Sequence, residues 1–266
     1  SLEAVARDAR YQVLGDVATK LKAVVLTGHH LDDQTETFLL ALKRGAGVKG
    51  LSAMRADVTL HEYALRIIRP LLNVSREQIE SYAREKALTW VEDDSNTDTQ
   101  FDRNFLRQQV IPQLVARWPS ITTTIARSTE HCQSAHELLN ELAYEDLQQF
   151  DNANGSLSQT ILERLSDNRI NNLLRYWISL RTSIMPSQTQ LVEVVKQVRA
   201  QCDKQPAIKV GELWLRRFQQ GLYLTPEFSD VSGWQKSLSI DALKQASTIA
   251  VQLPDNSGSL QVALTA

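Results

Sequence analysis

Cysteine is scarce: Cys132 and Cys202 are the only two among 266 residues, far apart and not in a Cys-x-x-Cys arrangement. This spacing argues against a disulfide framework and against a structural zinc site, so we expect a reducing, cytoplasmic setting. No apolar run reaches the roughly 18 residues that a membrane span needs, and no secretory signal pattern opens the chain. The sequence therefore predicts a soluble protein without a membrane partner.

An excess of charge of one sign is also lacking, because 29 basic and 31 acidic residues leave a formal charge of -2. A global positive field for nucleic acid is therefore excluded, and any RNA contact has to come from a local patch. Six arginines are candidates for that patch, each otherwise an ordinary surface residue: Arg117, Arg127, Arg169, Arg175, Arg216 and Arg217.

A starting methionine is missing as well. The chain opens on Ser1 inside a helical pattern and closes on "GSLQVALTA", which has the character of a strand. We therefore expect a fragment that is cut at both ends.

A hydrophobic content of 42% is enough for a real core. Residues 2–21 have helical spacing, and the β-branched run "AVVLTG" at 23–28 is typical of a strand buried on both faces. The next helix begins at the aspartates that follow and ends before Gly45, and "ALRIIRPLL" is a second strand. Alternating helices and strands predict an α/β fold with a partial, doubly wound, mostly parallel sheet.

Two further local elements complete this first part. Ser75 is predicted to cap a helix that runs to about Lys86, with Gln78 as its reciprocal partner. The stretch "LTWVEDDSN" at 88–96 is expected to form a last short strand.

Past Pro112 the pattern becomes mainly helical, with helices expected over 117–150, 161–180 and 188–199. The stretch 208–226 alternates like a β-hairpin around Gln-Gln-Gly. We expect three regions: an α/β domain at 1–112, a mainly helical domain at 113–226, and a linker with the start of a further domain at 227–266.

Chemistry-bearing residues concentrate in "GHHLDDQTETFLLALKRGAG" at 28–47. One interpretation is purely structural, with Asp33 and Glu36 as a capping pattern at a helix start. Capping does not require the two histidines, and Asp33 and Glu36 lie one turn apart on one face. Two such carboxylates at the end of a parallel strand suit an ammonium group, a divalent cation, or removal of a proton from an attacking amine.

A metal-dependent hydrolase is the alternative, since adjacent His and Asp side chains can hold zinc or manganese. No second His/Asp cluster follows that would complete the coordination, so we expect no metal-ligating residues.

A second polar cluster, "WVEDDSNTDTQFDRNFLRQQVIP", follows the last predicted strand. Arg103 and Arg107 are four residues apart, so one helix face would present both guanidinium groups to a phosphate. The alternative is an Asx-rich turn, from Glu92 to Asp98, with Asp–Arg ion pairs.

Together the motifs "LEAVARDARY", "GHHLDDQTETFLLALKRGAGVKGLSAM", "IIRPLL" and "WVEDDSNTDTQFDRNFLR" closely resemble those of the tRNA(Ile)-lysidine synthetases, which are N-type ATP pyrophosphatases of the PP-loop family. The match covers residue 2 to about 112, and weaker motifs continue to about 226. The resemblance implies an adenine nucleotide alpha hydrolase-like fold for the first domain and a tRNA-binding role for the helical one.

The resemblance also implies an activity. ATP adenylates the C2 oxygen of the wobble cytidine in a tRNA-Ile with a CAU anticodon, and the side-chain amine of free L-lysine then displaces AMP. The expected cofactors are ATP and Mg²⁺, the expected partners are that tRNA and lysine, and a homodimer is compatible with the family.

Residue roles carry over by position. Asp33 and Glu36 match the acidic pair that holds or deprotonates the incoming amine. His30 matches a residue beside the phosphates or the cytidine, and Arg103 matches an arginine that stabilises charge developing on the α-phosphate or the leaving group. These four are the expected catalytic residues. The expected substrate-binding set is Arg10, His29, Asp32, Lys43, Arg44, Arg69, Asn104 and Arg107.

One departure concerns the family's Ser-Gly-Gly-x-Asp-Ser phosphate loop, which these 266 residues do not contain. That loop would grip pyrophosphate and supply most of the magnesium site. We therefore expect no ATP chemistry from the fragment alone. An RNA-binding remnant without turnover stays open as an alternative, and a tRNA thiolase is disfavoured because its cysteine pattern is missing.

Overall fold

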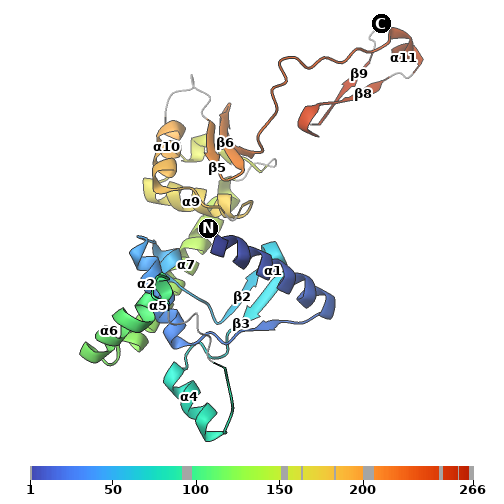
Figure 1. Ribbon diagram of the computed structural model, residues 1–266. Helices are drawn as coiled ribbons and strands as arrows, with labels where there is room; N and C mark the ends of the chain where they lie inside the picture. The colour runs from blue at the N-terminus through green and yellow to red at the C-terminus, as the bar shows by residue number, and fades with distance from the viewer. Residues whose placement is uncertain are drawn as a thin grey trace. The chain divides into compact units, whose positions relative to one another are not determined.

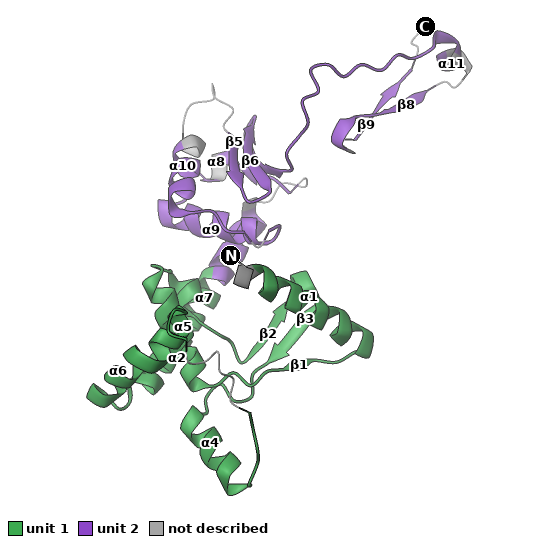
Figure 2. Cartoon of the chain, in the orientation of Figure 1, with its two compact units in different colours: residues 1–139 green, residues 140–266 purple. Residues whose placement is uncertain are grey.

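The computed structural model describes residues 2–91, 98–150, 155–162, 164–182, 184–199, 207–245, 248–256 and 258–263 (Figure 1). The chain forms two compact units, residues 1–139 and 140–266, and the boundary falls inside α7 (Ile121–Phe150) (Figure 2). The expected domain limits at 112 and 226 stay predictions. No helix within these ranges is long and apolar enough to cross a membrane.

The first unit is organised around a three-stranded sheet with the order β1-β3-β2. The two predicted strands are confirmed: β1 (Val25–Leu26) pairs in parallel with β3 (Leu65–Ile68). An unpredicted strand, β2 (Asp57–Leu60), pairs antiparallel with β3. Its four alternating residues are too few for a distinctive pattern, and only the pairing with β3 defines it.

The predicted first helix is confirmed as α1 (Leu2–Leu21), which lies against the strands of this sheet (Figure 1). Its Ala18 packs with Leu65 and Ile67 in a small buried core. A β-carbon at Gly15 would lie 2.0 Å from the carbonyl oxygen of Tyr63, so glycine is what allows α1 to approach the 3₁₀ turn η1 (His61–Tyr63).

Helices α2 (Leu31–Lys43) and α3 (Val48–Leu51) follow β1, and Gly45 takes the left-handed conformation expected after a helix end. Helix α4 (Arg76–Glu85) begins as predicted, because the Ser75 hydroxyl accepts a hydrogen bond from the backbone of Gln78.

The strand predicted at 88–96 is wrong in its described part, because residues 88–91 form no strand and Val91 is 95% exposed. An extended segment becomes a strand only when a neighbour completes its hydrogen bonds, and no strand of the described part pairs with it. Residues 92–97, which make up most of the predicted Asx-rich turn from Glu92 to Asp98, lie outside the described residues, as does Cys202. The chain then continues through α5 (Asp102–Phe105), a π-helical turn (Leu106–Val110) and α6 (Ile111–Arg117).

The helix predicted over 117–150 is α7, which begins at Ile121. In the second unit the single helix predicted at 161–180 is divided into α8 (Gln159–Leu162) and α9 (Asp167–Ser179), and the helix predicted at 188–199 is confirmed as α10 (Gln188–Arg199). The predicted hairpin is confirmed as β6 (Leu213–Phe218) and β7 (Gly221–Thr225), and it belongs to a four-stranded sheet β4-β7-β6-β5. Strand β5 (Ala207–Val210) and strand β4 (Leu157–Ser158) complete that sheet. Trp177 and the leucines of α9 pack against it in the larger core. The chain ends in α11 (Ile240–Gln245), β8 (Ile249–Gln252), η4 (Pro254–Asn256) and β9 (Ser259–Val262), where β9 is the strand expected at the tail.

Candidate active site

The helix that carries the acidic residues begins three residues earlier than the capping interpretation predicted, because His30 and not Asp33 is the capping residue. His30 precedes the first turn of α2, and its backbone N–H donates to Oδ2 of Asp33 at 3.0 Å. Asp33 is therefore the third helical residue and not the capping residue, and Glu36 plays no part in the cap. The helix start lies directly after β1, where open α/β sheets hold their ligands.

Glu36 is completely buried, and two guanidinium groups from the α5–π segment surround its carboxylate. Arg107 donates from Nε to Oε1 at 2.6 Å and from Nη2 to Oε2 at 3.1 Å. Arg103 places its Nε 3.0 Å from the same Oε2. This bidentate hydrogen bonding raises the pKa of Arg107 and compensates the burial of the Glu36 charge.

Asp33 is held less tightly than Glu36. Nη2 of Arg107 lies 3.3 Å from its Oδ1, and the ring of His30 lies 3.5 Å from its Oδ2. The expected convergence of the acidic pair is therefore present, since one guanidinium contacts both carboxylates. Arg103 and Arg107 do form ion pairs, but their partners are carboxylates of α2 and not the aspartates of the Asx-rich turn that precedes them.

The two histidines differ in their surroundings. His29 Nδ1 lies 2.8 Å from the Thr27 hydroxyl, and burial together with the nearby Arg69 lowers the pKa of His29, against the opposing effect of Asp33. His30 sits between Asp32 and Asp33, and its Nδ1 is buried without a hydrogen-bond partner in the described part of the chain. The His29 ring is therefore mainly neutral at pH 7.

Other predicted residues lie at the edge of this cluster. The carboxylate of Asp32 accepts the backbone N–H of Arg76 at 2.8 Å and so fixes the start of α4. Lys43 pairs with Asp102 at 2.6 Å, and the Asn104 amide donates to the carbonyl of Asp98. Arg10 and Arg44 are exposed on α1 and after α2, and Arg69 is only 7% exposed behind the end of β3.

Two glutamines that bond the backbone beside the buried face of α2 were not predicted from the sequence. The Gln34 amide is buried and bonds both backbone groups of Met54, at 2.9 and 2.7 Å. Gln133 of α7 donates to the same Met54 carbonyl at 3.1 Å and to that of Ser52 at 2.9 Å. A glutamine on the buried side of a helix was the available signal, although its partner is twenty residues away in sequence.

Among the residues with a described placement, no group of three or more His, Cys, Asp or Glu side chains could hold a metal ion. The metal-hydrolase alternative therefore gains no support from the geometry around His29 and His30.

Comparisons with known proteins show which families the two parts of the chain match. Residues 1–114 match the PP-loop domain family, and residues 157–223 match the TilS substrate binding domain family. The chain is 42% identical over 262 residues to the tRNA(Ile)-lysidine synthase of Actinobacillus pleuropneumoniae, which covers 98% of this chain and 60% of that protein. Identity to the same enzyme of Pectobacterium atrosepticum is 44% over 267 residues, covering 98% and 58%. For Vibrio cholerae it is 44% over 239 residues, covering 90% and 54%.

Proposed function

Because the chain belongs to the tRNA(Ile)-lysidine synthase family, we propose that it is part of a ligase that uses ATP to join free L-lysine to the wobble cytidine of a tRNA-Ile with a CAU anticodon. The chain spans 60% of the length of the Actinobacillus pleuropneumoniae relative, so the activity is proposed for the complete gene product. The observation that carries the proposal is the acidic pair at the start of α2, inside the PP-loop domain.

The reaction consists of two displacements. The C2 oxygen of the cytidine attacks the α-phosphorus of ATP, and pyrophosphate leaves. The lysine Nζ then attacks C2, the C2–oxygen bond breaks, AMP leaves with that oxygen, and the amine gives up a proton. The protein therefore has to hold a cationic side chain near C2 and accept a proton from it.

The contact distances indicate different roles for Glu36 and Asp33. Glu36 is bonded by Arg107 and Arg103 and has no exposed surface, so it anchors the two guanidinium groups. Asp33 has one longer contact to Arg107 and keeps some exposed surface, so an incoming ammonium group can share it. We assign Asp33 to lysine binding and Glu36 to holding Arg103 and Arg107 in place for charge that develops on the phosphate.

His29 is suited to accept the proton. A lowered pKa leaves its imidazole mainly neutral at pH 7, and Asp33 lies near enough to influence that pKa. The lysine amine held by Asp33 would then lie beside a neutral imidazole.

The carboxylates at the start of α2, those of Asp32, Asp33 and Glu36, do not fit a magnesium site. Asp32 already accepts a backbone N–H, and Asp33 and Glu36 face guanidinium groups. No step is therefore assigned to Mg²⁺ through these residues, and ATP is treated as a substrate.

Local contacts occupy some of the arginines that were predicted as candidates for RNA binding. Arg169 pairs with the buried Asp146, and Arg217 is itself buried. Arg216 lies over the rings of Trp214 and Phe228, and such cation–aromatic groups suit unstacked bases. We propose that Arg216, with the exposed Arg117 and Arg127, contacts tRNA. A homodimer and a cytoplasmic location are part of the same proposal.

The test is incorporation of labelled lysine into a tRNA-Ile transcript by the complete gene product. Incorporation should require ATP and should vanish with a transcript that carries uridine in place of the wobble cytidine. Substitution Asp33→Asn should lower incorporation by at least tenfold, whereas Glu77→Gln, an exposed carboxylate in α4, should change nothing. Salt-sensitive tRNA binding without incorporation would instead support the RNA-binding alternative.

A further inference from the structure

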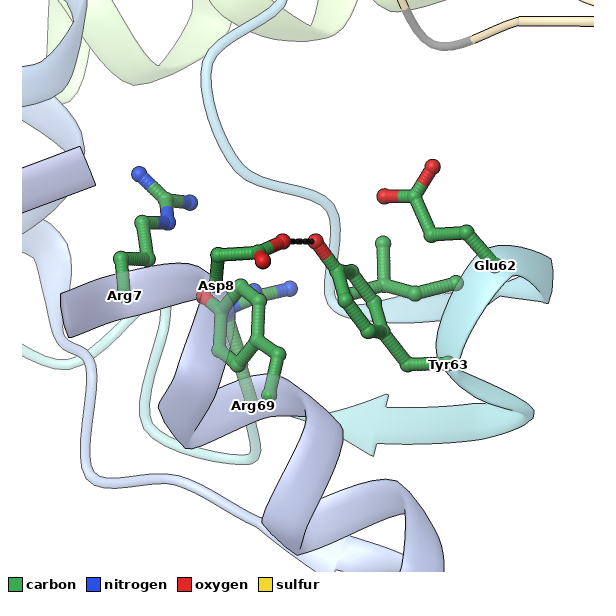
Figure 3. Close-up of a pocket in the computed structure, with 7 residues that line it drawn as sticks. Arg7, Asp8, Glu62, Tyr63 and Arg69 are labelled. Atoms are coloured by element: carbon green, nitrogen blue, oxygen red, sulfur yellow. Dashed lines mark hydrogen bonds between the residues drawn. The ribbon is translucent and has the colours of Figure 1, made fainter. Parts of the chain in front are cut away.

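A cavity of about 270 Å³ lies between α1, η1 and the end of β3, separate from the acidic pair (Figure 3). Tyr11 and Tyr63 form its aromatic walls, with ring centroids 5.8 Å apart in an edge-to-face arrangement. Ligand pockets for drug-sized molecules are typically about 300–1,000 Å³, so this volume suits a smaller molecule. Its charged lining residues are Arg7, Asp8, Glu62 and Arg69.

The cavity has a cationic end at Arg69. This side chain is only 7% exposed, and its Nη1 donates to the backbone carbonyl of Arg55 at 2.8 Å. Its Nε is buried and has no hydrogen-bond partner within the described residues. Burial lowers the pKa of Arg69, and within the described residues no carboxylate forms an ion pair with its guanidinium. A buried guanidinium without a counter-ion is costly, so an anion beside it would be stabilising.

The lining of the cavity also carries two carboxylates, Asp8 and Glu62. The Tyr63 hydroxyl donates to Oδ1 of Asp8, and this bond, with Glu62 nearby, raises the pKa of Tyr63 to about 12. Tyr63 therefore stays protonated and engages one oxygen of Asp8. Figure 3 shows the carboxylate of Glu62 on the same side as the Asp8–Tyr63 pair, with Arg7 beyond Asp8. A ligand with a cationic group can meet Asp8 and Glu62 here.

We propose that this cavity binds the zwitterionic end of the free amino-acid substrate. Its α-carboxylate would pair with Arg69 and Arg7, and its α-ammonium with Asp8 and Glu62. The inference rests on the proposed function, because the side-chain amine is left for Asp33. Arg69 directly follows Ile68, whose carbonyl accepts the backbone N–H of Thr27 at 3.0 Å, and the Thr27 hydroxyl lies 2.8 Å from Nδ1 of His29 just before α2. This chain of contacts connects the cationic end of the cavity to the start of the helix that carries Asp33.

The experiment compares L-lysine with 1,5-diaminopentane, which has both amines but no carboxylate. Calorimetric titration into the complete gene product should show at least tenfold weaker binding of the diamine, as expected for loss of a charge-assisted contact. Arg7→Gln should weaken lysine binding about tenfold and leave diamine binding unchanged, and Arg69→Gln should do the same. Arg66→Gln, which removes the exposed partner of Asp57 on the neighbouring strand β2, is the matched control and should change the binding of neither ligand.

Arg7 is exposed on α1, so its substitution tests the inference even if Arg69→Gln fails to fold. Equal affinity for lysine and the diamine, or lysine affinity that Arg7→Gln leaves unchanged, would overturn the inference. The proposed function is tested separately by lysine transfer. If lysine transfer occurs and both Arg7→Gln and Arg69→Gln leave the KM for lysine unchanged, the subsite is refuted and the proposed function stands. If lysine binding depends on the carboxylate but no transfer occurs, the subsite stands and the proposed function is refuted.

Discussion

Nε of Arg107 lies 2.6 Å from Oε1 of Glu36, and the two residues are 71 positions apart in the sequence. Because Glu36 is completely buried, this contact joins the helix after β1 to the segment that follows residue 98 and compensates a charge that could not otherwise be buried.

Removing that guanidinium should therefore destabilise the fold. Breaking a buried pair by deleting one partner typically costs about 3–5 kcal/mol, but Arg107 is 26% exposed and Arg103 still faces Glu36. We expect Arg107→Gln to lower the free energy of unfolding by about 2 kcal/mol in urea titrations. Arg84→Gln, which breaks the exposed pair with Glu80, should leave the free energy of unfolding nearly unchanged, and equal effects of the two substitutions would contradict this role.

The two glutamines that bond the Met54 carbonyl behind α2 should affect the free energy of unfolding cooperatively. Gln34 and Gln133 both donate to the Met54 carbonyl, so either one alone leaves that oxygen bonded. We expect the double variant Gln34→Ala with Gln133→Ala to be less stable than the two single losses predict, by about 0.5–1 kcal/mol or more. A cycle of Gln133→Ala with Gln12→Ala, an exposed side chain of α1, should be additive.

Gly15 should resist substitution although it lies inside a helix. Alanine normally stabilises a helix interior by about 1 kcal/mol relative to glycine. At Gly15 the added carbon would lie 2.0 Å from the Tyr63 carbonyl oxygen, so we expect a loss of about 1–3 kcal/mol instead. Gly28→Ala meets no atom within 4 Å and is the control. Thermal unfolding that shows Gly15→Ala to be neutral would mean that α1 does not pack this closely.

The stability of the first unit should fall in mild acid because of His29. Its pKa in the folded state is below its ordinary value of 6.5, so the unfolded chain binds the proton more readily. This contribution is fully present above pH 6.5 and is lost as the pH falls from 6.5 through the lower pKa of the folded state. His136 shifts in the same direction, mainly by burial. Unfolding titrations at several pH values should show a shallower acid slope for His29→Gln, and an unchanged slope would contradict the assignment.

Local signals in the sequence predicted local structure well. Ser75 and Gln78 form the predicted cap, because both partners lie within one helical turn. The convergence of Asp33 and Glu36 followed from helical spacing, and both contact Arg107.

Features that depend on distant partners could not be predicted. Nothing near Arg107 indicates that its partner is Glu36, and nothing near Arg69 indicates that it is buried below α1. The strand expected at 88–96 failed for the same reason: its apolar residues gave a strand pattern, but no neighbouring strand of the described part pairs with residues 88–91.

The most direct test of the lysine site separates the two displacements for Asp33→Asn in the complete gene product. Adenylation alone is measured as tRNA-dependent exchange of pyrophosphate into ATP without lysine, and transfer is measured as a function of lysine concentration. We expect unchanged exchange and a KM for lysine raised at least tenfold, because only the contact to the amine is lost. Weakened exchange with a normal KM for lysine would contradict the assignment and place Asp33 with the ATP chemistry.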